Sequence, residues 1–377
     1  MKIKVKHTCE NFNSFRSEKV KSLFNAESGH NWEHTAELPI EEEGWQIGLI
    51  VGASGSGKTS IGRQIWENGI VNLAVGWNPD LPIIEDIAPG LDMNTVTSAL
   101  SAVGLGDVPA WLRPFKVLSN GEQFRAGLAR LICEAPDKVV IDEFTSVVDR
   151  QIAKIGASAF SKAWRKTKGK QIVLLSCHYD IVEWLQPDWV YDTRTGEVKK
   201  KASKRPPIKL DIWKVDGSYW KFFKQHYYLD LKHPPCAEYF VGTVDGELVC
   251  HVAVCPNFQI KGYRATRLVV MPEWQGAGVG TAFLNQIMQY HLEGNGRCQR
   301  KYPTYFHTSH PQLCGYMRHS PKWKQVSAKL TGDNKARSIK SLQNTSKGFE
   351  KGKMTTGGFG GHFRAIQGFR YLGNEEI

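Results

Sequence analysis

Short apolar runs bounded by polar turns recur along the first half of the chain and alternate with helical patterns. Strands are predicted over Lys2–His7, Glu37–Ile40, Ile47–Val51, Lys138–Ile141 and Gln171–Ser176. Helical spacing predicts helices over Ser14–Asn25, over Asn94–Val103, and after Gly121 through the run FRAGLARLICEA. Strands that alternate with helices in this way predict an α/β domain.

The pattern after residue 207 is different and predicts an α+β fold. Strands are expected over Ile208–Trp213, Tyr239–Val244, Leu248–Val254, Tyr263–Met271, Thr304–Thr308 and Phe363–Tyr371. Helices are expected over Tyr219–Tyr228, Thr281–Leu292 and His310–Met317. A chain of 377 residues is also too long for one ordinary core. We therefore predict a domain over 1–195, a basic linker over 196–207 and a second domain over 208–377.

Charge separates the two halves of the chain. Residues 1–195 hold 21 Lys and Arg against 24 Asp and Glu, a net charge of −3, whereas residues 196–377 hold 28 against 13, a net charge of +15. The basic half favours a polyanionic partner such as nucleic acid, and its alternatives are a merely basic domain or one that binds a phosphate-rich cofactor. No apolar run is long enough to span a bilayer and the N-terminus has no signal-peptide core, so we expect a cytoplasmic protein without membrane contact. Eight cysteines without a C-x-x-C pair suit reduced thiols.

The first glycine-rich loop follows the apolar run Ile47–Val51 and precedes a helical segment. It matches G-x-x-x-x-G-K-T, a pattern whose backbone N–H groups and following helix N-terminus hold phosphate oxygens. Lys58 would reach the β- and γ-phosphates of ATP, and the Thr59 hydroxyl would ligate Mg²⁺. The expected ATP-binding residues in this loop are Gly52, Ala53, Ser54, Gly55, Ser56, Gly57, Lys58, Thr59 and Ser60.

Further motifs follow the loop in a fixed order: LSNGE at Leu118–Glu122, VVIDE ending at Glu143, and His178 after the run Gln171–Ser176. Asp142, at a strand end, can hold Mg²⁺ through water, and Glu143 can polarise the attacking water. His178 can hydrogen-bond the γ-phosphate.

With SVVD ending at Asp149, this ordered set resembles the ABC ATPase family. The resemblance covers about half of the chain, from near Glu37 to near Asp192. It implies a head-to-tail homodimer with ATP between the protomers, in which Ser119 and Gly121 contact the nucleotide held by the partner.

Three departures from the family pattern bear on function. Asn120 and Glu122 replace a glycine and a glutamine of the usual LSGGQ sequence. The interval from Lys58 to Leu118 is 60 residues, which is shorter than in transporters of the family. This interval contains no clear Q-loop glutamine, and Asn78 is the nearest substitute. The subdomain that couples to membrane partners is thus reduced, which predicts an ATP-dependent switch rather than a transporter.

A second strand, glycine loop and helix occurs in the basic half, without the Lys-Thr pair. Its loop runs from Gln275 to Gly280, and such a loop presents N–H groups to a pyrophosphate, although a plain glycine-rich turn is the alternative. The Q-x-x-G-x-G sequence and the strand order resemble the GNAT acyltransferase family, whereas a dinucleotide-binding domain would carry its loop after the first strand. The resemblance implies acetyl-CoA contacts at Val269, Val270, Met271, Gln275, Gly276, Ala277, Gly278, Val279 and Gly280.

No sequence motif as specific as the two glycine-rich loops identifies the residues that carry out acyl transfer. The resemblance implies that Tyr316 protonates the departing thiolate, and a half-buried packing tyrosine is the alternative. Candidates for the general base are His226, Glu273 and His310. A metal site at His307 and His310 lacks further ligands in the sequence. The pair His226-Tyr227 gives a faint resemblance to the Mom DNA-modification proteins of phages.

Three functions remain open at this point. The first is an ATPase whose ATP-driven dimer positions acetyl-CoA-dependent N-acyl transfer, with nucleic acid as the acceptor. The second is an ATP-switched nucleic-acid-binding module with a non-catalytic acyltransferase fold, favoured by the basic stretch His319–Arg370 and its interleaved phenylalanines. The third is an N-acetyltransferase acting on a protein or a small amine.

Overall fold

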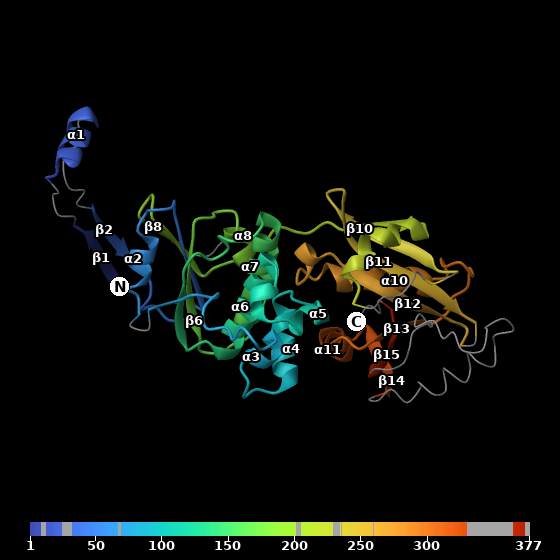
Figure 1. Ribbon diagram of the computed structural model, residues 1–377. Coiled ribbons are helices and arrows are strands. Elements are labelled where there is room, and N and C mark those ends of the chain that lie inside the picture. Colours follow the sequence, from blue (N-terminus) through green and yellow to red (C-terminus); the bar gives the residue numbers. More distant parts are fainter. Residues whose placement is uncertain are drawn as a thin grey trace. The chain divides into compact units, whose positions relative to one another are not determined.

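The computed structural model describes residues 1–8, 13–24, 32–66, 69–200, 205–228, 234, 236–258, 260–329 and 365–373. The chain folds as two compact units (Figure 1). Unit 1 contains Met1–Trp77 and Ser119–Pro206, and unit 2 contains Asn78–Leu118 and Pro207–Ile377. Most of the basic stretch with its phenylalanines lies outside the described residues.

Unit 1 is built on a six-stranded sheet in the order β4-β5-β6-β3-β7-β8, parallel except for the pair β7–β8. Its strands are β3 (Ile47–Val51), β4 (Ile70–Val71), β5 (Lys138–Ile141), β6 (Gln171–Ser176), β7 (Trp189–Asp192) and β8 (Glu197–Lys200). Its helices are α1 (Phe15–Phe24), α2 (Lys58–Gly62), α6 (Asn120–Glu134), α7 (Arg150–Trp164) and α8 (Val182–Leu185). The strands β1 (Lys2–His7) and β2 (Trp32–Glu37) form a separate antiparallel pair.

The central strand β3 shows why an apolar run here contains a glycine. All five of its residues are buried, as expected for a parallel strand covered on both faces. A Cβ atom on Gly48 would lie 2.0 Å from the ring of Trp189 on the neighbouring strand β7. The glycine therefore makes room for the tryptophan.

Two sequence predictions in unit 1 differ from the structure. The strand expected at Glu37–Ile40 lies earlier, at β2, where it pairs with β1. The stretch expected as a linker over 196–207 contains β8, which continues the sheet as a hairpin with β7. Both differences arise because cross-strand pairing, which a local pattern does not show, sets where these strands lie.

Unit 2 is built on a seven-stranded sheet in the order β14-β15-β13-β12-β11-β10-β9. The strands are β9 (Asp211–Val215), β10 (Glu238–Val244), β11 (Glu247–Asn257), β12 (Gly262–Val270), β13 (Thr304–Thr308), β14 (Trp323–Lys329) and β15 (Ile366–Tyr371). The main helices are α10 (Val279–Leu292) and α11 (Pro311–His319). The helix expected over Tyr219–Tyr228 is broken into η2 (Gly217–Tyr219), α9 (Trp220–Phe223) and η3 (Lys224–His226).

The segment 78–118 lies between two parts of unit 1 in the sequence but folds with unit 2. It contains α3 (Ile83–Asp86), α4 (Met93–Ala102), α5 (Val108–Trp111) and η1 (Phe115–Val117). Helix α4 contacts α11, and the Trp111 ring lies against that of His310 with centroids 5.9 Å apart. The predicted boundary at residue 195 places the segment 78–118 in the first domain, whereas the structure places it in unit 2. The sequence does not indicate this packing, because it depends on contacts between residues about 200 positions apart.

Strands β12 and β13 create an opening in the sheet of unit 2. They pair in parallel over three positions, from Tyr263–Thr304 to Ala265–Phe306, and no further pairing joins them beyond Ala265 in the described strands. A β-bulge in β12 places an extra residue at Arg267, whose φ is +56°. Such a bulge redirects side chains and leaves backbone groups outside the ladder. The pocket described below lies at this opening.

The buried carboxylate of Glu238 stabilises unit 2. It accepts hydrogen bonds from Lys214 Nζ at 2.5 Å and the Arg297 amide at 2.8 Å, and His291 Nε2 lies 3.2 Å away. Burial opposes ionisation, but these hydrogen bonds together hold the pKa of Glu238 down at about 2, below its ordinary value of 4.5. The stabilisation is therefore present above pH 4.5 and is lost as the pH falls toward 2.

We expect Glu238→Gln to lower the free energy of unfolding at pH 7 by about 2–3 kcal/mol, because the ion pairs are lost in a buried setting. Thermal unfolding of the full chain at pH 7, 5 and 3 measures this. The deficit should shrink at pH 3, where the wild-type carboxylate loses part of its own contribution. Glu247→Gln, at an exposed position at the start of β11, is the control and should unfold like the wild type. Equal stability of the two variants at pH 7 would contradict the role of Glu238.

Candidate nucleotide and acyl-CoA sites

The first glycine-rich loop connects the C-terminal end of β3 to α2. Gly55 and Gly57 have φ values of +79° and +84°, a conformation that glycine adopts without strain. A Cβ on Gly52 would lie 1.9 Å from Thr193 Oγ1, so the loop closes tightly on the residue after β7. The Thr193 hydroxyl also donates to Ser56 Oγ at 2.8 Å. The loop is thus a preformed cradle.

Lys58 lies within this cradle. Its ammonium donates to the carbonyl oxygens of Gly52 and Ala53, at 2.8 and 2.7 Å. These contacts fold the side chain back along the loop, where a phosphate group would place its oxygens. The residues present therefore fit a bound nucleotide phosphate.

Other predicted ATP-site residues follow β5 and β6, which lie on one side of β3 in the sheet. Because β5, β6 and β3 are parallel neighbours, their carboxyl ends meet at one edge of the sheet. Asp142 and Glu143 follow β5, and His178 follows β6. The Asp142 carboxylate accepts the Glu143 N–H at 2.8 Å, and Glu143 has a φ of +51°. The fold brings together the residues that the sequence predicted for Mg²⁺ and for the attacking water.

Ser176, which the sequence did not single out, joins three of these loops. Its carbonyl accepts the Gly52 N–H at 3.3 Å. Its hydroxyl donates to the Phe144 carbonyl at 2.9 Å and accepts the His178 N–H at 3.1 Å. The residue is fully buried. It therefore fixes the positions of the cradle, the acidic pair and the histidine relative to one another.

The ring of His178 is oriented by Arg150, the first residue of α7. Arg150 Nη1 lies 2.9 Å from His178 Nδ1, and the guanidinium also pairs with Asp180. Arginine only donates, so Nδ1 is the acceptor and the ring proton lies on Nε2. Burial and the charge of Arg150 lower the pKa of His178. The neutral ring thus retains one N–H that can donate to a phosphate.

Ser119 begins α6 as its N-terminal cap. Its hydroxyl accepts the Glu122 N–H, while the Glu122 carboxylate accepts from the Ser119 amide at 2.8 Å and the hydroxyl at 2.7 Å. A Cβ on Gly121 would lie 2.9 Å from Ile152 of α7. The LSNGE segment is therefore a complete capping box that presents a helix N-terminus.

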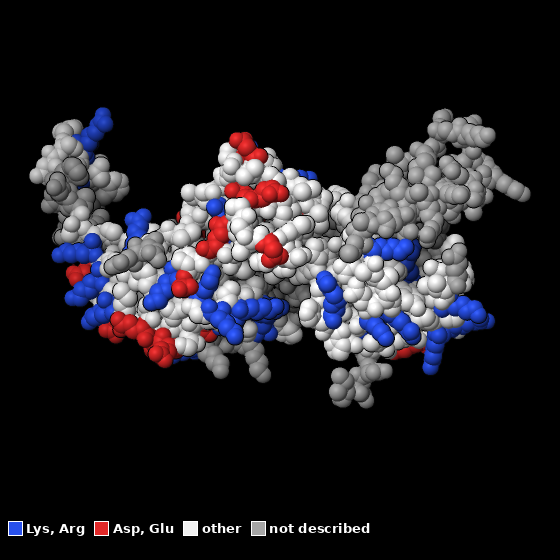
Figure 2. All heavy atoms as spheres, turned by 90° about the horizontal axis from the view of Figure 1, so that it is seen from below, with Lys and Arg blue, Asp and Glu red and all other residues white. Residues whose placement is uncertain are grey.

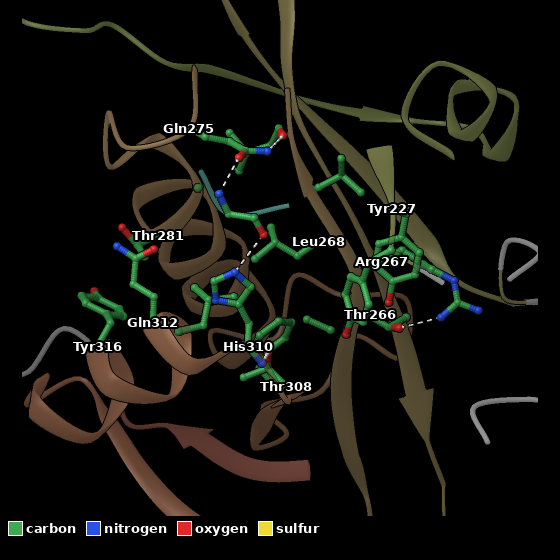
Figure 3. A pocket seen from close by; sticks show the side chains of 18 of the residues that line it. Tyr227, Thr266, Arg267, Leu268, Gln275, Thr281, Thr308, His310, Gln312 and Tyr316 are labelled. Atoms are coloured by element: carbon green, nitrogen blue, oxygen red, sulfur yellow. Dashed lines mark hydrogen bonds between the residues drawn. The ribbon is translucent and has the colours of Figure 1, made fainter. Parts of the chain in front are cut away.

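A pocket of about 460 Å³ lies in unit 2 at the opening between β12 and β13 (Figure 3). Within the loop and strand predicted for CoA, the pocket is lined by Val269, Val270, Gln275, Gly276, Gly278 and Gly280. Met271, Ala277 and Val279 belong to the same elements but do not line it. In Figure 3 Thr281, Gln312 and Tyr316 lie on one side of the pocket, and Tyr227, Thr266 and Arg267 lie on the other.

The second glycine-rich loop fits a pyrophosphate. Gly276 and Gly278 have φ values of +88° and +89°, and Gly278 caps the N-terminus of the 14-residue helix α10. Nothing lies within 4 Å of a Cβ placed on Gly278, whereas a Cβ on Gly280 would lie 2.6 Å from Val270. The loop is thus open toward the pocket at Gly278 and packed against β12 at Gly280.

Tyr316 of α11 lines the pocket and is oriented by a chain of hydrogen bonds. Trp323 Nε1 donates to Asn285 Oδ1 at 2.9 Å, and Asn285 Nδ2 donates to the Tyr316 hydroxyl at 2.9 Å. Because the tryptophan fixes the amide, the tyrosine oxygen is an acceptor in this chain. The phenolic proton is left to donate elsewhere. The role of Tyr316 as a proton donor stays a prediction.

The three candidate general bases differ in whether they line the pocket. His226 and His310 line the pocket, but Glu273 does not. His310 Nε2 donates to the Gly106 carbonyl at 3.0 Å, and burial lowers the pKa of His310. The described residues contain no group of three His, Cys, Asp or Glu side chains that could hold a metal ion, so no further ligands join His307 and His310 there.

His251 of β11 was not singled out by the sequence, yet it supports the bulge. Its Nδ1 donates to the Arg267 carbonyl at 3.0 Å, and its ring packs among Trp220, Phe223 and Tyr239. Burial lowers the pKa of His251 to about 4, so the ring is neutral at pH 7. It acts as a positioning residue for β12.

Residues 180–309 match the sequence model of the Acetyltransferase (GNAT) family, a range that includes β10 to β13 and the loop Gln275–Gly280. Its first part, up to residue 206, lies in unit 1.

Relatives of the N-terminal region are ABC ATP-binding proteins. The teichoic acids export ATP-binding protein TagH of Listeria innocua is 25% identical over 267 residues, 62% of this chain and 78% of that protein. The zinc import ATP-binding protein ZnuC of Pseudomonas syringae is 30% identical over 142 residues, 32% of this chain and 53% of that protein. ABC transporter I family member 10 of Arabidopsis thaliana is 32% identical over 131 residues, 28% of this chain and 47% of that protein.

Solved structures of ABC cassettes are also similar to this chain. The dimeric cassette of a bacterial ABC transporter has a TM-score of 0.34 at 16% identity, covering 44% of this chain and 88% of that chain. A post-hydrolysis cassette bound to ADP and Pi has a TM-score of 0.36 at 17% identity, covering 55% of this chain and 100% of that chain.

The chain is thus similar to ABC ATP-binding proteins in its N-terminal region and to the GNAT family over residues 180–309. The mixed sheets with helices in both units agree with the predicted fold class. The similarities in sequence support ATPase and acetyltransferase activity. None of the helices in the described part of the chain is long and apolar enough to cross a membrane.

Proposed function

We propose that this chain is an ATP-dependent N-acyltransferase that moves an acetyl group from acetyl-CoA to an amine on nucleic acid. The observation that carries the proposal is the pocket at the opening between β12 and β13, with the loop Gln275–Gly280 in its wall. ATP and acetyl-CoA are its cofactors, and we place it in the cytoplasm.

The ATPase half would act as a head-to-tail homodimer. The capping box at Ser119 exposes a helix N-terminus, while the cradle at Lys58 is built from the separate loop at Gly52 and Ala53. A second protomer would bring its own Ser119 to complete each site. Thr59 and Asp142 would hold Mg²⁺, which neutralises phosphate charge when bound. Glu143 would polarise the attacking water, and the Nε2 proton of His178 would stabilise the γ-phosphate.

The acyltransferase half would work by direct transfer. Gly276 and Gly278 would hold the pyrophosphate of CoA, and the bulge in β12 would offer backbone N–H groups to the oxyanion. The acceptor nitrogen attacks the thioester carbonyl carbon, the C–N bond forms and the C–S bond breaks. The departing thiolate takes a proton from Tyr316. The acceptor nitrogen gives up its own proton to His226 or to water.

The side of the pocket away from Tyr316 indicates the class of acceptor. Tyr227 and Arg267 lie on this side (Figure 3), and His226, Tyr228 and Arg264 also line the pocket. The ring centroids of Tyr227 and Tyr228 are 5.0 Å apart. The described residues that line the pocket include no Asp or Glu. A cationic amine would lack a counter-charge there, whereas a neutral base amine next to phosphates would find aromatic rings and arginines. The faint resemblance to Mom proteins points the same way.

The surface of unit 2 is consistent with a polyanionic acceptor. Figure 2 shows Lys and Arg side chains spread over one face of this unit, with few Asp or Glu among them. This basic surface also favours a second function, an ATP-switched nucleic-acid-binding module without catalysis. In that case salt-dependent DNA binding would persist after CoA binding is removed, and no acyl transfer would occur.

One assay separates these functions. Labelled acetyl-CoA and ATP are offered with duplex DNA, tRNA and a protein mixture in parallel, and we expect label in a nucleic-acid fraction. Tyr316→Phe should slow transfer about 10²-fold by removing the proton donor, while Tyr302→Phe serves as the matched control. Label in the protein or small-amine fraction alone would assign a different acceptor. No transfer to any acceptor, with CoA bound, would leave the binding module as the function.

A further inference from the structure

We propose that residues 101–111 form a wall of the acyl-CoA pocket and make the affinity for acyl-CoA depend on the nucleotide bound at the ATP site. This inference rests on the proposed function of the pocket. The segment 78–118 folds with unit 2 although unit 1 residues precede and follow it in the chain.

The segment is hydrogen-bonded directly to the loop Gln275–Gly280. The Gly106 N–H donates to Gln275 Oε1 at 3.1 Å, and the Gly106 carbonyl accepts from His310 Nε2 at 3.0 Å (Figure 3). A single glycine thereby joins the first residue of the loop to the residue that caps α11. Ser101, Gly104 and Gly106 line the pocket together with that loop.

Gln275 connects the segment to the strand that carries the bulge. Its Nε2 donates to the Val270 carbonyl at 3.1 Å, while its Oε1 accepts from Gly106. Both ends of the side-chain amide are therefore engaged. A displacement of Gly106 would move the glutamine that holds the loop against β12.

Gly104 shows how closely the segment approaches the loop. Its φ is +89°, and a Cβ placed on it would lie 2.3 Å from the Gln275 carbonyl oxygen. Any side chain here would force the two backbones apart. Behind them, Trp111 Nε1 donates to the Leu105 carbonyl at 2.8 Å, and the Trp111 ring packs against His310. Residues 104–106 are thus packed against Gln275 and fixed in place by Trp111.

The other end of the segment leads into the ATP-site motifs. Leu118 is followed directly by Ser119, the cap of α6 and the residue expected to contact the partner's nucleotide. Within the segment, the Ile83 N–H donates to the Arg113 carbonyl at 3.0 Å, which ties its two ends together. A movement of Ser119 on ATP binding would therefore move the segment 78–118, because the two are consecutive in the chain and the Ile83–Arg113 hydrogen bond stiffens the segment. The same segment is hydrogen-bonded to Gln275 through Gly106. Linkage requires that acyl-CoA in turn changes the affinity for ATP.

The test measures the affinity for CoA by calorimetry, with and without a non-hydrolysable ATP analogue, in the full-length protein. We expect the analogue to change the affinity of the wild type roughly 5-fold or more, a typical coupling. In Gly104→Ala the affinity for CoA should fall roughly tenfold, and the analogue should no longer change it, because the wall is displaced.

Two controls match this variant. Gly246→Ala introduces the same strain, with a φ of +83°, in an open hairpin turn of unit 2, and Gly90→Ala changes an open position of the same segment. Both should behave like the wild type. His310→Leu removes the donor to Gly106 and should reproduce Gly104→Ala, while His310→Gln, which retains an N–H, should restore part of the linkage.

The outcomes distinguish this inference from the proposed function. If the wild type does not bind CoA, the proposed function fails and this inference fails with it. If CoA binds but the analogue leaves its affinity unchanged, the linkage alone is refuted. If the analogue still acts on folded Gly104→Ala as on the wild type, residues 101–111 are not the connection.

Discussion

Lys58→Ala is expected to reduce the rate of ATP hydrolysis by about 10²–10³-fold, the effect of removing one preorganised donor from a transition state. The ammonium already lies inside the cradle, bonded to the Gly52 and Ala53 carbonyls. It is therefore placed to meet the charge that develops on the transferred phosphoryl group. In a homodimer both sites carry the substitution, so no intact site remains.

The measurement is steady-state release of phosphate from the full-length protein. Lys138→Ala is the control, because Lys138 is an exposed residue at the start of β5, in the same unit. It should hydrolyse ATP like the wild type. Turnover of Lys58→Ala within a few fold of wild type, with the fold intact by thermal unfolding, would refute the assignment of this loop as the hydrolytic site.

The chemistry of the ATP site could be predicted from the sequence because its parts are local. A short apolar run such as Ile47–Val51, bounded by a turn and a glycine loop, favours a buried parallel strand, as the structure shows. The glycine loop after it suits φ values above zero, which the structure shows at Gly55 and Gly57. Asp142 and His178 follow runs of the same kind. Their convergence follows from the parallel order of β5, β6 and β3. The roles proposed for these residues stay predictions.

The remaining features depend on contacts between distant residues. Ser176 reads as an ordinary strand residue, and its role comes from three loops that meet around it. The strand β14 lies within a basic stretch without apolar alternation, and pairing with β15 determines it. The contact between Gly106 and Gln275 joins residues 169 positions apart. No periodicity in either segment indicates that they meet.

Gly278→Asp is expected to weaken CoA binding by about 100-fold or more, because a like charge in an anion site costs several kcal/mol. Gly278 faces open space at the N-terminus of α10, where the loop would hold the pyrophosphate. Aspartate tolerates left-handed backbone better than most residues and is a favoured helix cap. The fold should therefore survive a change that fills the anion site with a carboxylate.

Gly246→Asp is the matched control for backbone strain and charge. Gly246 has a φ of +83° with nothing within 4 Å of a Cβ, and it lies in the turn between β10 and β11, apart from the pocket residues. This variant should bind CoA as the wild type does. Calorimetric titration of both variants, with thermal unfolding to check the fold, distinguishes electrostatic exclusion from general destabilisation. CoA affinity retained in a folded Gly278→Asp variant would show that the pyrophosphate binds elsewhere, and the loop would then be a structural turn.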